Sequence, residues 1–247
     1  MSKRTNDHLS QIVTHWSNIY MVHDQAESQA SFQQSIQQFL NRYGRPIRKY
    51  LLGATQDKMV AEELAQEFAY RFVRGDLRHA SPHKGRFRDF LKTVLRNIVN
   101  DYRRVRVGES ATEVDDQSTP IHLDPFAASE TEFNESWRSE IINATWQRLK
   151  ELEKSRNNHF FTVLNFRAQN PSLNSQSVAD ELSKTLPNPV SANWVRQNLK
   201  RARSKFWSIL LDEISNTLSP NATYEEIETE LAELKLLNFG KQQKPAV

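Results

Sequence analysis

Residues 191–206 combine amide and basic side chains that can hydrogen-bond to nucleic acid. On a helical wheel of about 100° per residue, an apolar stripe falls on one side and the polar side chains fall opposite it. Asn and Gln can pair with adenine in the major groove, and Arg and Lys can pair with guanine or with phosphate. The side chains expected to contact DNA are Asn193, Arg196, Gln197, Lys200 and Arg201. A solvated basic face is the alternative interpretation of this pattern.

A second basic segment, residues 84–106, places cations beside aromatic side chains. Such a mixture can hold single strands, because the cations pair with phosphates and the rings stack on bases. However, Phe87 and Phe90 fall on the apolar stripe of a regular helix, so core packing is the role expected for them. The remaining candidates for nucleic-acid contact are Arg86, Arg88, Lys92, Arg96, Asn100 and Arg103. From this segment alone, nucleic-acid binding and a solvated face both stay open.

Residue types that support catalysis are missing or scattered. The sequence contains no cysteine, which excludes disulfides, thiolate nucleophiles and thiolate zinc sites. Neither G-x-G-x-x-G nor G-x-x-x-x-G-K-[ST] occurs, so no phosphate-binding loop is predicted. The histidines form no H-E-x-x-H or comparable spacing, and scattered surface positions explain them better than a metal-dependent enzyme does. We therefore expect a protein that is not an enzyme and that needs no cofactor and no metal.

Composition places the chain among polar, water-exposed proteins. Its 247 residues are 38% hydrophobic with a net charge of +3, and the mean hydropathy is -0.70. Basic residues gather in two segments separated by acidic ones, which predicts two separate places that touch phosphate. No apolar run is long enough to cross a bilayer, and the first residues lack a hydrophobic secretory segment. A cytoplasmic protein without membrane insertion is expected, and the lack of cysteine agrees with a reducing compartment.

The elements that carry these side chains are predicted to be helices, because apolar residues recur at helical spacing and no alternating strand pattern stands out. The fold class is therefore predicted to be all-α. Within the segment 32–50, a helix is expected that ends near Gly44 and Pro46. A second helix is expected at 58–74, and Gly75 is expected to end it. Further helices are predicted at residues 85–106, 136–156, 159–168, 175–186, 191–215 and 222–238.

Between the two basic regions, residues 107–135 are acidic, contain two prolines and show no sustained period, which predicts a flexible linker. The chain is thus expected to form two small helical domains at 1–106 and 136–219, followed by an acidic extension at 220–247. In the second domain, residues 177–182 and 191–206 have the arrangement of a helix-turn-helix, with Ser191 as the N-cap of the second helix. The turn between them is longer than is usual for this motif.

Three stretches resemble signatures of the sigma-70 family of RNA polymerase sigma factors, and they occur in that family's order. Residues 59–68 (MVAEELAQEF) are similar to its D-A-E-D-L-x-Q-E-x-F stretch. Residues 85–104 (GRFRDFLKTVLRNIVNDYRR) resemble F-R-x-[WF]-L…R-N-x-x-x-D-x-x-R-R, and residues 195–203 (VRQNLKRAR) resemble V-[RK]-x-x-L-x-R-A-R. The resemblance is to the small two-domain, extracytoplasmic-function (ECF) group. Residues 15–19 (HWSNI) and the elongated turn look like its planctomycete-type variant.

This resemblance implies a transcription initiation factor that binds core RNA polymerase and directs it to promoter DNA. Glu63, Gln66 and Glu67 would dock on the clamp of the polymerase's largest subunit. The candidates at residues 86–103 would recognise and melt the minus-ten element. The helix at 191–206 would read the minus-thirty-five element while its domain contacts the flap of the second-largest subunit. An anti-sigma factor or another regulator would be a further partner.

Two alternatives stay open. A stand-alone helix-turn-helix repressor or activator would bind duplex DNA tightly without polymerase, as a dimer on two half-sites. The acidic helix of the C-terminal extension, with Tyr224, Ile227, Leu231 and Leu234 on one side, would either pack on its own domain or cover the basic recognition helix.

Overall fold

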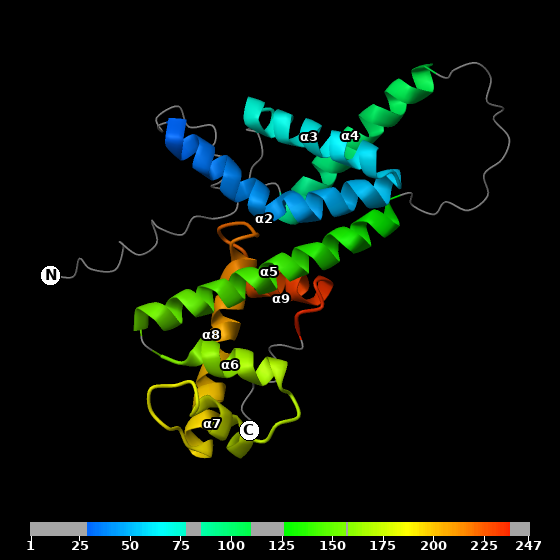
Figure 1. The fold of residues 1–247 in the computed structure, drawn as a ribbon. Coiled ribbons are helices and arrows are strands. Elements are labelled where there is room, and N and C mark those ends of the chain that lie inside the picture. Colours follow the sequence, from blue (N-terminus) through cyan, green and yellow to red (C-terminus); the bar gives the residue numbers. More distant parts are fainter. Residues whose placement is uncertain (1–28, 78–84, 110–125, 157, 238–247) are drawn as a thin grey trace. The chain divides into compact units, whose positions relative to one another are not determined.

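The computed structural model of the chain describes residues 29–77, 85–109, 126–156 and 158–237. These residues form helices and no strand, so the prediction of an all-α fold is confirmed for them (Figure 1). None of their helices combines the length and the apolar character needed to cross a membrane. In chain order the helices are α2 (Gln29–Thr55), α3 (Lys58–Arg74), α4 (Phe87–Glu109), α5 (Ala127–Arg156), α6 (Phe160–Gln169), α7 (Ser175–Leu182), α8 (Ala192–Ser215) and α9 (Tyr224–Glu233).

The chain divides into two compact units. Unit 1 consists of Met1–Glu140 and Ser215–Thr223, and unit 2 consists of Ile141–Ile214 and Tyr224–Val247. Each unit has its own buried core. Because α5 and α8 contribute residues to both units, the predicted domain boundaries at residues 106 and 136 stay a prediction.

An aromatic core holds α2, α3 and α4 together in unit 1. The rings of Phe39 and Phe72 stack with centroids 4.1 Å apart, and Phe68 stacks on Phe72 at 6.4 Å. Phe87, at the start of α4, meets Phe39 edge to face. Each of these rings is fully buried. Such pairs add about 0.5–1.5 kcal/mol each beyond the area that they bury.

Helix α2 does not end near Gly44 and Pro46, as predicted, but continues to Thr55. Figure 1 shows it bent near its middle, which is the usual effect of a proline inside a helix. The apolar stripe continues past the bend, since Ile47 and Leu51 are buried on the same core. Tertiary packing of α2 therefore outweighs the tendency of Gly44 and Pro46 to end the helix.

Helix α3 has the predicted bounds, because its ends are fixed by local interactions. The Asp57 carboxylate accepts hydrogen bonds from the backbone N–H groups of Met59 (2.8 Å) and Val60 (3.2 Å) and caps the N-terminus. Gly75 follows the last turn in the left-handed conformation, with φ 92°, which favours glycine.

Helix α4 lies on the core along a face rotated slightly from the predicted one. Leu95 and Val99 are fully buried, although they were not on the expected stripe. Phe90, which lies on the predicted stripe, is only half-buried.

Helix α5 begins at Ala127, earlier than the predicted start at residue 136. Residues 127–135 were predicted as linker but are helical, because Phe133 and Trp137 are buried in unit 1. The rings of Trp137 and Tyr43 stack with centroids 5.1 Å apart. Residues 107–109 of the predicted linker are also helical, because α4 continues to Glu109. Residues 110–125 lie outside the described residues, as do residues 15–19.

Unit 2 is built around two apolar clusters. The first joins α6, α7 and α8 through a set of fully buried or nearly buried side chains: Val163, Val178, Ala179, Leu182, Val195 and Leu199. The second joins α5 to α8, where the rings of Trp146 and Phe206 lie 4.9 Å apart. These clusters fix the outward face of α8.

The turn between α7 and α8 is closed by a local hydrogen bond. The Ser183 hydroxyl accepts from the backbone N–H of Val190 at 2.9 Å. Helix α7 ends at Leu182, before the predicted end at residue 186. Ser191 accepts from the N–H of Trp194 at 3.2 Å, which confirms it as the N-cap of α8.

Helix α9 is shorter than the predicted helix at 222–238. Lys235 adopts φ 56° and ends the helical segment, and the N–H of Leu236 bonds back to the Leu231 carbonyl at 2.7 Å. Leu231 and Leu234 are buried as predicted, but Tyr224 is 76% exposed, so its predicted place on the buried stripe is wrong.

Candidate functional site

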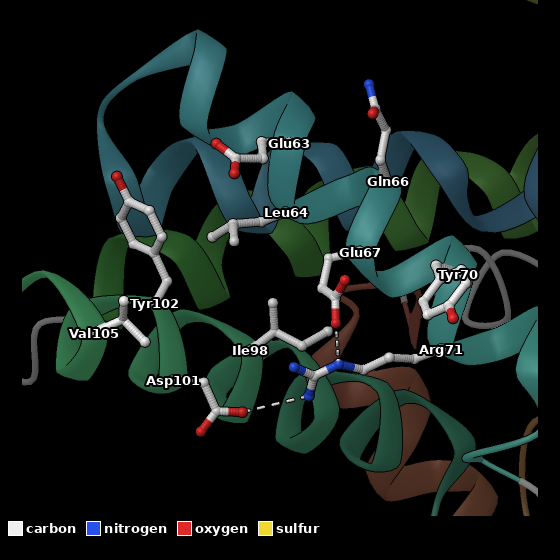
Figure 2. A pocket seen from close by; sticks show the side chains of 10 residues that line it. All are labelled: Glu63, Leu64, Gln66, Glu67, Tyr70, Arg71, Ile98, Asp101, Tyr102 and Val105. Atoms are coloured by element: carbon white, nitrogen blue, oxygen red, sulfur yellow. Dashed lines mark hydrogen bonds and ion pairs between the residues drawn. The ribbon is translucent and has the colours of Figure 1, made fainter.

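A groove of about 480 Å³ lies between α3 and α4 (Figure 2). All three side chains predicted to dock on polymerase, Glu63, Gln66 and Glu67, line it. Leu64 and Ile98, which are both buried, form its apolar base. Figure 2 shows that Tyr102 and Val105 of α4 form the opposite wall. The groove thus presents carboxylates and an amide around an apolar base.

The outer face of α3 carries a stripe of exposed side chains that alternate in spacing by four and three residues. The members of this α3 stripe are Met59, Glu63, Gln66, Tyr70 and Val73. Met59 is 84% exposed and Tyr70 is 58% exposed, although both are largely apolar. The core side chains Leu64 and Phe68 lie on the opposite side of the helix. Spacing of this kind is typical of a helix that packs against another helix.

Arg71 connects the two walls of the groove. Its guanidinium donates to Glu67 Oε1 at 2.6 Å and to Asp101 Oδ2 of α4 at 3.3 Å. The hydrogen bond to Glu67 is the largest cause of a raised Arg71 pKa, and Asp101 adds to it against the effect of burial. The Glu67 carboxylate therefore already has a partner within the unit, whereas the Glu63 side chain is exposed.

The candidate contacts to the minus-ten element lie on α4, except for Arg86, which directly precedes it. One of them is not accessible. Arg88 is 1% exposed and donates to Asn134 Oδ1 of α5 at 2.7 Å. A buried guanidinium is retained only where hydrogen bonds satisfy it. The prediction that Arg88 contacts DNA is contradicted by its burial in this structure.

Three more of these candidates form ion pairs within the unit. Arg86 bonds to Asp89 at 2.7 Å, and Lys92 Nζ and Arg96 Nη2 lie 3.5 Å and 2.9 Å from the carboxylate of Glu130. Burial opposes ionisation of Asp89, but Lys92, Arg86 and Arg88 together hold its pKa below the ordinary value.

Arg103, another of the candidates, donates to the Ala54 carbonyl oxygen at 2.9 Å. Its guanidinium also lies 5.0 Å from the centroid of the Phe126 ring. Asn100 is half-buried. The predicted minus-ten surface is thus partly covered by the segment that begins α5.

The candidates on α8 are all exposed, as a nucleic-acid contact requires. Gln197, Lys200 and Arg201 line a groove of about 740 Å³, together with Phe160 from the start of α6. Asn193 and Arg196 lie outside this groove, nearer the N-terminus of α8. The structure thus brings three of the five predicted side chains together at one hollow in a basic surface.

Several side chains at these places were not among the predicted residues. In the α3–α4 groove they include Tyr70, Tyr102 and Val105, and the alternating spacing of the α3 stripe is the signal that identifies Tyr70. In the α8 groove they are Phe160, which comes from α6, and Ser204, Lys205 and Ser208, which follow from continuing the polar face of α8 by one more turn. No local sequence pattern indicated that Phe126 and Glu130 contact α4, because their partners on α4 lie more than 20 residues away in sequence.

Among the described residues, no group of three or more His, Cys, Asp or Glu side chains is arranged to hold a metal ion. Comparisons with protein-family models, with curated proteins and with solved structures found no match to this chain.

Proposed function

We propose that the protein is a transcription initiation factor of the sigma-70 type, which binds core RNA polymerase and directs it to promoters. Unit 1 would dock on the polymerase through the α3–α4 groove and contact the minus-ten element through α4. Helices α7 and α8 would act as a helix-turn-helix that reads the minus-thirty-five element. The protein would work in the cytoplasm and carry out no chemistry of its own.

The α3 stripe is the observation that carries this proposal. Largely apolar side chains at Met59 and Tyr70 stand in solvent on a helix whose opposite face is already committed to the core. Exposed apolar groups gathered on one face are typical of protein interaction sites. The alternating spacing suits a helical partner, and the polymerase clamp expected from the sequence resemblance is a coiled coil. Glu63, within this stripe, would select a partner with basic side chains.

The α8 surface supports the DNA-binding part of the proposal. The buried positions Val195, Leu199 and Ala202 hold the helix so that Gln197 and Lys200 face outward. An amide and an ammonium group on adjacent turns can contact one base edge and one phosphate. Phe160 beside them adds an apolar wall.

Titration of the fluorescently labelled protein with bacterial core RNA polymerase tests the proposal. We expect saturable, stoichiometric binding, and weak binding to duplex DNA by the protein alone. The same titration with free duplex separates the alternative, because a stand-alone regulator would bind duplex tightly and ignore polymerase. That second pattern would reject the proposed function.

A further inference from the structure

The segment that begins α5 lies directly on the cationic surface of α4. The Phe126 ring is 5% exposed. The guanidinium carbons of Arg96 and Arg103 lie 4.9 Å and 5.0 Å from its centroid. One aromatic ring thus contacts two cations that are two helical turns apart on α4.

The next two turns of α5 continue this contact. Glu130 pairs with Lys92 and Arg96, and Asn134 accepts from Arg88. Phe126, Glu130 and Asn134 follow one another at four-residue spacing, so they lie on one face of the segment. Together they engage four of the six side chains predicted to contact the minus-ten element.

Close packing against α2 shows that this contact is specific in shape. A Cβ atom placed on Gly53 of α2 would lie 2.9 Å from the Cα atom of Ser129, so the backbones approach where only glycine fits without a shift. Ser129 is fully buried there. The start of α5 consequently has one defined position against α2 and α4.

The Phe126 ring and the Glu130 carboxylate resemble the base and the phosphate of a nucleic-acid strand in how they interact with cations. An arginine guanidinium stacks on the face of a nucleobase much as it stacks on Phe, and cations that pair with a carboxylate also pair with phosphate. The Phe126 ring therefore stands in for a base and the Glu130 carboxylate for a phosphate. Because both are tied to the same chain, they reduce the affinity for a competing strand without preventing its binding.

We propose that Arg96 and Arg103 form a stacking site for one base of single-stranded nucleic acid, and that the start of α5 occupies this site in the free protein. Lys92 and Arg96 would then hold the adjacent phosphate. This inference rests on the proposed function, since it describes how the minus-ten surface of α4 is regulated. Binding of a strand and seating of Phe126–Asn134 exclude each other.

Substitution of Gly53 provides the test. In Gly53→Ala the added Cβ atom would lie 2.9 Å from the Cα atom of Ser129, so the start of α5 cannot keep its position against α2. We therefore expect the variant to bind a short fluorescent single-stranded DNA about tenfold more tightly than wild-type protein does. Gly44→Ala is the matched control, because the nearest neighbour of its added Cβ atom is the end of the Arg48 side chain, at 3.4 Å. Unchanged or weaker binding by Gly53→Ala would overturn the inference.

A second variant tests the inference by removing the groups that occupy the site. Phe126→Ala with Glu130→Gln removes the ring and the charge from the site while leaving every α4 cation in place, so affinity for the single strand should rise by about tenfold. Glu135→Gln adds the same charge change at an exposed position of α5 and should leave affinity unchanged. Unchanged or weaker binding by the double variant would contradict the proposal. Titration of each variant with core polymerase separates this inference from the proposed function, because neither change touches the α3–α4 groove.

Discussion

The guanidinium of Arg96 lies against the ring of Phe126, with 4.9 Å between the guanidinium carbon and the ring centroid. This contact joins α4 to a segment that sequence analysis assigned to a flexible linker. It changes the expected availability of the α4 surface, since a cation predicted to touch DNA already has an aromatic and a carboxylate partner within unit 1. The α3 stripe and the outward face of α8, in contrast, are exposed.

The first prediction concerns the α3–α4 groove. Glu63→Lys and Tyr70→Ala should each weaken binding to core RNA polymerase by about tenfold, or about 1.4 kcal/mol. The first places a cation where a basic partner is expected, and the second removes a ring from the stripe. Both side chains are exposed, so the melting temperature should not change. Glu135→Lys, an exposed charge reversal on α5, is the matched control, and a loss of affinity as large as that of Glu63→Lys would contradict the assigned groove.

The second prediction concerns the connection between α3 and α4. Arg71→Ala removes hydrogen bonds to Glu67 and Asp101 and should lower the free energy of unfolding by about 1 kcal/mol, because the group is only partly screened by solvent. Thermal unfolding measures this change. The control is Arg74→Ala, which removes an exposed pair with Asp76 two residues along the chain and should leave stability unchanged. Equal effects of the two substitutions would contradict a structural role for Arg71.

The third prediction concerns α8. Lys200→Ala should weaken binding of the reconstituted holoenzyme to all promoters alike and lower the salt dependence of binding by about one ion, as expected for a lost phosphate contact. Gln197→Ala should instead relax preference at one base pair, at a cost of about 1–3 kcal/mol. Promoter fragments selected from a random library measure both. Loss of polymerase docking in either variant would mean that the faces of α8 are wrongly assigned.

The fourth prediction concerns pH. The folded-state pKa of Asp89 is lowered, so the ionised carboxylate stabilises the fold above the unfolded-state pKa of about 3.9 and this contribution is lost as pH falls through the folded-state value. Asp89→Asn should therefore destabilise the protein by up to about 1 kcal/mol near neutral pH. The difference from wild type should shrink as the solution is acidified. Chemical denaturation across that range measures it, and a difference that grows toward acid pH would contradict the assigned ion pairs.

Local signals in the sequence were sufficient to predict the ends of a helix where those ends are fixed by the helix's own capping residues. Helix α3 has its predicted bounds because Asp57 and Gly75 cap it, and Ser191 caps α8 as predicted. The all-α fold follows from the repeated helical spacing. The family resemblance predicted Glu63, Gln66 and Glu67 as docking residues, and all three line one groove in the structure.

Contacts between distant residues could not be predicted in this way. Arg88 looked like an exposed cation, but its partner Asn134 lies 46 residues along the chain. The continuation of α2 past Pro46 depends on burial of Ile47 and Leu51 against other helices. The early start of α5 depends on Phe133 and Trp137 finding the core of unit 1, while the acidic composition around them indicated a linker.

Site-specific crosslinking to core RNA polymerase tests the central claim most directly. Because the chain has no cysteine, Gln66→Cys introduces a single thiol on the α3 stripe, and Glu135→Cys provides a matched thiol on α5. A short photo-activated crosslinker on position 66 should join the protein to the largest polymerase subunit, and the same reagent on position 135 should give little product. Crosslinking of the two positions with equal yield, or no product from position 66 under conditions where the complex forms, would contradict docking through α3.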